Sequence, residues 1–183
     1  GSATLNLSGA NSYQGYTTIS DNSGILAITG SGTLGSASYV GAISIGTGAT
    51  FKYSSNQNQT LQTGVISGAG TLTKDTGSSS VLTLSNASNS YTGITTISAG
   101  TISISADANL GTASTLVATQ LTLSGGNLRT TGTFSLATNR GITLGTGGGG
   151  IDVVSDTLTY PGAIVGANTF TKYGTGTFVL TGS

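Results

Sequence analysis

The stretch VLTLSNASNSYTGITTIS at Val81–Ser98 decides how the whole chain is interpreted, because TLNLSGANSYQGYTTIS at Thr4–Ser20 repeats most of it. In both stretches Leu alternates with Thr, Asn or Ser, and the closing Thr-Thr-Ile-Ser is again rich in β-branched residues. An alternation with a period of two is typical of a half-buried β-strand. Similar short clusters follow along the chain, and no long stretch carries a helical apolar stripe. The sequence therefore predicts an all-β protein.

The composition excludes several classes of protein. Only 5% of the 183 residues are charged, Gly numbers 31, and the chain has neither Cys nor His. A disordered linker shares this composition, but it lacks the alternating apolar clusters. The five cationic residues are too scattered to bind a nucleic acid or an anionic membrane; they are Lys52, Lys74, Arg129, Arg140 and Lys172. We therefore expect no nucleic-acid partner, and no apolar run is long enough for membrane insertion.

The repetition continues beyond the first pair of stretches. ISGAGTLTK at Ile66–Lys74 matches IVGANTFTK at Ile164–Lys172 at six of nine positions. We interpret 4–80 as a first copy, 81–175 as a second copy and 176–183 as the start of a third, all within one continuous solenoid domain. Residues 1–3 are interpreted as the remnant of a cleaved tag. We expect the paired segments to mark equivalent turns of successive stacked copies.

The two copies differ in length at one place. Seven residues separate Gly35 from Ile43, whereas 30 residues separate the corresponding Gly111 and Ile142. The extra residues near 112–141 amount to about one turn of a large β-helix, and a solenoid accepts a whole turn because each turn contacts only its neighbours. A sandwich or barrel would show Asn-Gly or Asp-Gly hairpin turns, which this sequence lacks. We therefore predict a right-handed parallel β-helix of about eight turns.

Several motifs of the chain resemble the passenger-associated transport repeat of bacterial autotransporters, also called the autotransporter-associated β-strand repeat. They are the Leu-Thr-Leu-Ser run followed by SYTGITTI, the run GGGGIDVVSDTLT, and the pattern IVGANTFTKYGTGTFVL. This resemblance implies a β-helical passenger segment that is secreted across the Gram-negative outer membrane and displayed on the cell surface. It implies a rigid stalk, with adhesion or secretion as its task and no enzymatic activity. Its partners would be the neighbouring β-helix turns and a host-cell, matrix or self-adhesion partner.

Two alternatives to the stalk stay open. One is a homotypic adhesin that aggregates cells, and the other is a carbohydrate-active β-helix. The second alternative requires that Asp152, Asp156 and Arg140 converge in one groove. On a continuous strand the two aspartates would share one face, but they would lie about 13 Å apart. Paired-carboxylate hydrolysis needs a shorter distance.

The remaining candidate residues have mostly structural interpretations. Tyr13 and Tyr91 occupy the same place in the repeat, and we interpret them as packing residues in preference to sugar-stacking platforms. Lys74 and Lys172 also recur, and we expect solvated charges that protect a sheet edge. The stretch Gly147–Ser155 fits the calcium-binding nonapeptide, but it is not repeated in tandem, so we interpret it as a tight turn. We expect no catalytic, cofactor-binding or metal-ligating residue.

Overall fold

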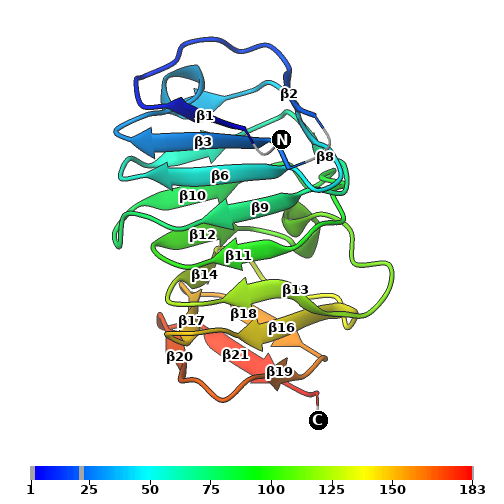
Figure 1. The fold of residues 1–183 in the computed structure, drawn as a ribbon. Coiled ribbons are helices and arrows are strands. Elements are labelled where there is room, and N and C mark those ends of the chain that lie inside the picture. Colours follow the sequence, from blue (N-terminus) through cyan, green and yellow to red (C-terminus); the bar gives the residue numbers. More distant parts are fainter. Residues whose placement is uncertain (1–2, 21–22, 183) are drawn as a thin grey trace.

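A computed structural model describes residues 3–20 and 23–182, and every strand ladder in these residues is parallel. The chain winds downward as a stack of turns, crossing the front of Figure 1 from right to left and returning behind. That sense of winding is right-handed. The prediction of an all-β, right-handed parallel β-helix is confirmed, and the eight strands of the longest sheet correspond to about eight turns.

Each turn visits three faces in the order third face, front sheet, back sheet. The front sheet contains β1 (Thr4–Leu7), β3 (Ile25–Gly30), β6 (Thr50–Ser55), β9 (Thr71–Lys74), β11 (Thr95–Ile97), β13 (Val117–Leu123), β16 (Arg140–Leu144) and β19 (Ile164–Val165). The back sheet contains β4 (Ser38–Tyr39), β7 (Gln59–Leu61), β10 (Val81–Leu84), β12 (Thr101–Ile104), β14 (Asn127–Thr130), β17 (Gly149–Val153) and β20 (Phe170–Tyr173).

The third face consists of two short sheets, one in each half of the rod. Its strands are β2 (Thr17–Ile19), β5 (Ile43–Ile45), β8 (Ile66–Ser67), β15 (Phe134–Ser135), β18 (Thr157–Tyr160) and β21 (Thr177–Leu180). Two short 3₁₀-helices complete the described elements, namely η1 (Gly35–Ala37) and η2 (Asp107–Leu110). Between the two short sheets the third face lacks regular strands, and the chain there pairs through isolated backbone hydrogen bonds.

The alternation of the sequence explains the core. Along β9 the side chain of Leu72 is fully buried, whereas those of Thr71 and Thr73 are only partly buried. Parallel pairing in register places inward residues of successive turns directly above one another, so Phe51 lies over Leu72 in the front sheet. Leu, Ile, Val and Tyr side chains from all three faces form one continuous core cluster along the rod. The apolar positions thus stabilise the stack from within, while Ser and Thr face outward.

The repeated sequences do not lie above one another. The opening strand of the first copy, β1, lies in the front sheet, whereas its counterpart β10 lies in the back sheet. The third opening strand, β21, lies on the third face. The Thr-Thr-Ile segments show the same shift, because β2 lies on the third face and β11 in the front sheet. Each copy therefore advances by several whole turns plus one third, and the expectation that paired segments mark equivalent turns is wrong in this respect.

The longer second copy contains a complete additional circuit. Between Gly111 and Ile142 the chain passes through β13, β14 and β15, one strand on each face, before it enters β16. The first copy passes from η1 through β4 to β5 without such a circuit. Because a whole circuit changes height and not face, the one-third advance is the same in both copies. The boundaries assigned to the copies remain an interpretation of the sequence.

The interpretation of 1–3 as a tag remnant falls partly outside the described residues, which exclude 1–2. Ala3 is described, and its carbonyl oxygen accepts a hydrogen bond from the Ile25 amide at 2.9 Å. This bond continues the ladder between β1 and β3, so Ala3 takes part in the stack.

Candidate functional site

Tyr91 anchors the corner that follows it. Its side chain is fully buried, and its hydroxyl lies 2.9 Å from the Thr95 hydroxyl, four residues further on. Burial raises the pKa of Tyr91 to about 12. Tyr13 makes the same contact in the first copy, 3.1 Å from the Thr17 hydroxyl, but it is 40% exposed in the first turn. Tyr91 is therefore a packing residue that fixes the turn, and its buried ring offers no platform to a sugar, whereas the Tyr13 ring is partly exposed and packs edge-on against Tyr39.

Lys74 is buried, which contradicts the expectation of a solvated charge. It lies in an inward-facing column between Tyr53 and Ile97, its register partners in the turns before and after. Its ammonium group lies 2.7 Å from the Ser80 hydroxyl and 5.5 Å from the centre of the Tyr53 ring, and it also donates to the Thr76 carbonyl. Burial lowers the pKa of Lys74 to about 8, partly offset by Asp75.

The position of Lys74 follows from strand parity. Leu72 faces inward, and residues two apart on a strand share a face. Lys74 must therefore face inward too, and the alternation in Thr-Leu-Thr-Lys already contained this information. An interior lysine is stable here because its three protons find oxygen partners and an aromatic ring.

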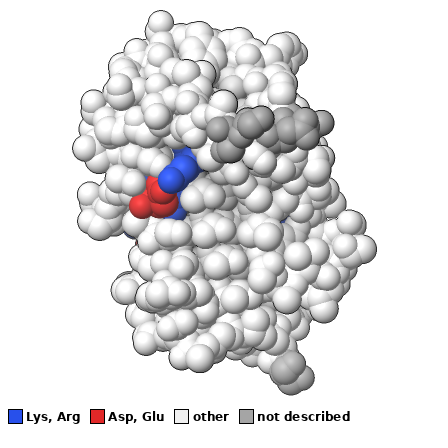
Figure 2. All heavy atoms as spheres, in the orientation of Figure 1, with Lys and Arg blue, Asp and Glu red and all other residues white. Residues whose placement is uncertain are grey.

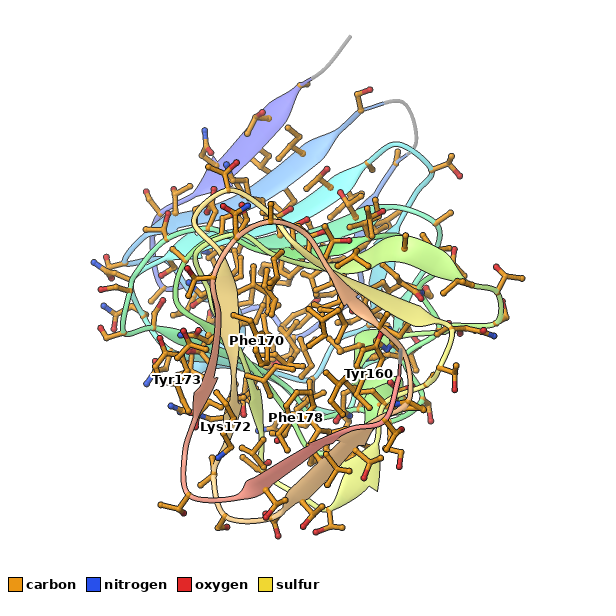
Figure 3. All side chains as sticks on the ribbon, turned by 90° about the horizontal axis from the view of Figure 1, so that it is seen from below. Tyr160, Phe170, Lys172, Tyr173 and Phe178 are labelled. Atoms are coloured by element: carbon orange, nitrogen blue, oxygen red, sulfur yellow. The ribbon has the colours of Figure 1, made fainter. Side chains whose placement is uncertain are left out.

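Lys172 repeats this arrangement in the last described turn. Its ammonium group donates to the Gly174 carbonyl at 2.6 Å, just as Lys74 donates to the carbonyl two residues after it. Strand β20 ends the back sheet, and Lys172 is exposed. Figure 3 looks onto this end and shows Phe170 and Phe178 inside the bore, with ring centroids 5.8 Å apart. The exposure expected for Lys172 is thus observed, although its place two residues after Phe170 on the strand puts its side chain on the inner side.

The residues of the carbohydrate-active alternative do not converge. Asp152 lies in β17 of the back sheet and forms an ion pair of 2.7 Å with Arg129, its register partner in the preceding turn. Asp156 lies in the bend after β17 and not on the same strand. Arg140 begins β16 in the front sheet and is paired with Asp107. Asp152 and Arg140 are therefore held in separate ion pairs on different sheets, and the three residues do not line one groove.

The buried cluster around Arg140 was not expected from the sequence. The guanidinium group binds the Asp107 carboxylate through two bonds of 2.8 and 3.1 Å. It also donates to the carbonyl oxygens of Leu110 and Gly111, at 2.9 and 2.8 Å. Arg140 is 1% exposed and the Asp107 side chain 23%, so the guanidinium group of this ion pair is buried while the carboxylate reaches the surface. It fastens η2 and the start of the added circuit to the turn below. The sequence contained one signal of this burial, because Arg140 lies two residues before the buried Ile142 on the same strand and so faces the same side.

The glycine run Gly147–Gly150 makes a turn, as the sequence predicts. Gly147 and Gly148 have φ angles of 91° and 68°, and Gly149 already begins β17. These angles favour glycine, since an L side chain is strained there. Within the described residues no three His, Cys, Asp or Glu side chains gather as a metal-binding group.

The outer surface is almost without charge. Figure 2 shows one small cluster of charged atoms on this side of the rod, and most of the remaining surface is uncharged. The front-sheet pair Lys52 and Asp75 joins β6 to the turn below, with 2.7 Å between the ammonium group and the carboxylate. The described helices are single 3₁₀ turns, far too short to cross a membrane. The arrangement as a whole has the chemistry of a neutral, hydroxyl-rich rod.

Comparison with known proteins fits this picture. The profile of the passenger-associated transport repeat matches residues 1–28, 76–104 and 170–183. These three segments contain β1, β10 and β21, the opening strands that lie on three different faces. Among curated proteins, the adhesin BmaC autotransporter of Brucella suis biovar 1 (strain 1330) is 34% identical over 221 residues. That alignment covers the whole chain but only 6% of the relative, and no solved structure matches.

Proposed function

We propose, from the premise that this chain is built of passenger-associated transport repeats, that it is a rigid segment of a surface-displayed passenger. The segment supports secretion across the outer membrane of a Gram-negative cell, and it holds adhesive surfaces away from that cell. The observation that carries this proposal is the unbroken front sheet of eight parallel strands, which runs beside one continuous core. Such a stack is rigid along its length and has no hinge, because each turn is fixed to both neighbours by backbone hydrogen bonds.

Two features support display in preference to catalysis. Asp152 and Arg140 are each used in an ion pair between adjacent turns, as are Lys52 and Asp75, so these charges serve the stacking of the rod. The relative that aligns with the whole chain is named an adhesin. The chain spans 6% of that relative, so the ligand of the complete protein lies beyond this proposal.

Display in a Gram-negative host tests the proposal. The chain is placed between a signal peptide and an autotransporter β-barrel, and its surface exposure is measured with an antibody on intact cells. Leu72→Asp places a charge in the core and should lower display several-fold, since the stack no longer folds. Thr73→Asp is the matched control, because Thr73 is the outward neighbour of Leu72 and lies opposite Lys52. Equal display of both variants would show that the folded rod is not what secretion and display require.

A further inference from the structure

An exposed segment projects from the rod where the added circuit begins. It comprises residues 114–119, Ser-Thr-Leu-Val-Ala-Thr, and is the longest run of consecutive exposed residues in the described chain. In Figure 1 the chain between η2 and β13 bulges from the side of the stack at this place. Leu116 is 70% exposed and Val117 is 39% exposed. A macromolecule in solution can therefore reach this segment.

Few hydrogen bonds hold the backbone of this segment. The amides of residues 113–116 donate no hydrogen bond to the rest of the described chain. The Ser114 carbonyl accepts a bond of 3.1 Å from the Asn139 side chain, and the Val117 amide reaches the Asn139 carbonyl at 3.4 Å. The register between β13 and β16 shifts between Val117 and Leu121, so the ladder is regular only from Leu121 onward. A segment with so few bonds opens locally at a low cost in free energy.

The side chains of the segment suit one class of endopeptidase. All of them are small, aliphatic or hydroxylated, and none is charged or aromatic. A serine endopeptidase of the elastase type has a small specificity pocket, and Leu116 and Val117 offer aliphatic side chains to it. A partner that binds an extended peptide does so largely through main-chain hydrogen bonds. The free amides of residues 113–116 supply these bonds.

We propose that this segment is a proteolytic processing site, cut after Leu116 or Val117 by an extracellular endopeptidase of elastase-type specificity. The step is a hydrolysis. The peptide C–N bond breaks, the hydroxyl of a water molecule bonds to the carbonyl carbon before the cut, and the remaining proton goes to the amine of the next residue. The inference rests on the proposed function only for the encounter between a displayed rod and such an enzyme, so purified chain is sufficient to test the site itself.

The interior cluster around Arg140 holds the two ends that such a cut creates. Arg140 follows the cut, and its guanidinium group binds the Asp107 carboxylate and the carbonyl oxygens of Leu110 and Gly111, which all precede it. The ladders between β11 and β13 and between β12 and β14 also join strands from the two sides. A cut rod therefore stays one particle and keeps its length, although its chain is no longer continuous.

A second stretch of similar composition serves as an internal control. The residues Val-Val-Ser at 153–155 lead out of β17, and Val154 is 41% exposed. The Val154 amide donates to the Thr130 carbonyl at 3.2 Å, and the Val154 carbonyl accepts bonds from the Thr175 amide and hydroxyl at 3.2 and 2.8 Å. Its main chain is therefore engaged on both sides. An enzyme that needs a free main chain cuts the projecting segment and leaves this stretch intact.

Limited proteolysis of the purified chain with pancreatic elastase tests the site. We expect the first internal cut after Leu116 or Val117, located by mass spectrometry of the fragments, while the stretch around Val154 survives. Val117→Pro should slow this cut about ten-fold or more, because proline has a fixed φ and no amide hydrogen. Proline is tolerated at the first residue of a strand, and Val117 begins β13. Val154→Ala is the matched control and should leave the rate unchanged. Circular dichroism verifies that both variants are folded.

Size-exclusion chromatography of the cut chain tests whether its parts stay together. We expect one peak at the position of the intact chain, which separates into two fragments only in denaturant. A first internal cut elsewhere, or an equally fast cut in folded Val117→Pro, would overturn the assignment of the site. Fragments that separate without denaturant would overturn the role given to Arg140. A chain that is cut as expected but is not displayed on cells would contradict the proposed function and leave the site itself standing.

Discussion

The two copies of the repeat use similar ion pairs in different environments. In the first copy Lys52 and Asp75 meet on the front sheet with side-chain exposures of 37% and 22%. In the second copy the Asp107 side chain is 23% exposed, but its partner Arg140 is only 1% exposed and also binds two carbonyl oxygens. The buried pair lies where the second copy contains its additional circuit. The difference indicates that the first copy forms its ion pair at the surface of the regular stack, whereas the added circuit is held by a buried guanidinium group.

Removing one partner of the buried pair should give the largest difference in stability between the two copies. Asp107→Ala leaves the Arg140 guanidinium without a counterion inside the protein, and we expect a loss of about 3–5 kcal/mol in the free energy of unfolding. Asp75→Ala, the counterpart in the first copy, should cost less than about 1 kcal/mol because its pair is partly solvated. Urea unfolding of both variants measures the two values. Similar losses would mean that the added circuit does not depend on the buried pair.

Lys74 and Lys172 provide the next test, through pH. The pKa of Lys74 in the folded chain, about 8, lies below its ordinary value of 10.5. Between these values the unfolded chain holds a proton that the folded chain lacks, so the free energy of unfolding rises with pH, by at most about 1.4 kcal/mol per unit. Above the ordinary pKa of tyrosine the trend should reverse, because the raised pKa of Tyr91 keeps its proton on the folded chain longer.

Unfolding by urea across this pH range measures the effect. Lys74→Met should remove the rise with pH, whereas Lys172→Met should leave it unchanged, because Lys172 is exposed. If the free energy of unfolding of Lys74→Met still rises with pH, another titratable group causes the rise.

The tyrosine corners should show a smaller difference. Tyr91→Phe leaves the buried Thr95 hydroxyl without its partner, and we expect a cost of about 1–2 kcal/mol. Tyr13→Phe removes the same contact in the first turn, but the Thr17 hydroxyl keeps its hydrogen bond of 2.6 Å with the Tyr39 hydroxyl, so the change should cost less than about 0.5 kcal/mol. Thermal unfolding of the two variants resolves the difference. Equal shifts would show that burial does not set the value of the contact.

The smallest effect is expected on the outer face of the second copy. Asp152→Asn breaks the ion pair with Arg129, whose side chain is 37% exposed. We expect a change below about 1 kcal/mol that diminishes further as salt is added, since exposed charges are screened. Urea unfolding at low and high salt measures it. A loss as large as that of Asp107→Ala would contradict the distinction between surface and interior pairs.

The fold was predictable because its signals are local. The alternation around Leu72 and the repeated openings at Thr4 and Val81 specify strands and stacking directly. The fate of Lys74 was also encoded, since its parity with Leu72 directs it inward, but the usual preference of lysine for water favoured the opposite interpretation. The convergence of Arg140 with Asp107 was not predictable from spacing alone, because it depends on how far the added circuit projects.

The face on which each copy lies was beyond reach of the sequence comparison. Identical strands such as β2 and β11 carry no mark of the sheet to which they belong. Their face depends on the number of strands that precede them, and short irregular segments replace strands at two places on the third face. An error of one such segment shifts every later assignment.

The one-third advance also has a consequence for how such a rod changes length over generations. The first and second copies differ by a complete circuit, yet both end one face further than they began. What the copies share is therefore not a residue count but the remainder left after whole circuits are subtracted. A gene can gain or lose circuits inside one copy, and every copy downstream keeps its orientation. The length of the rod and the face on which each copy lies can therefore change independently.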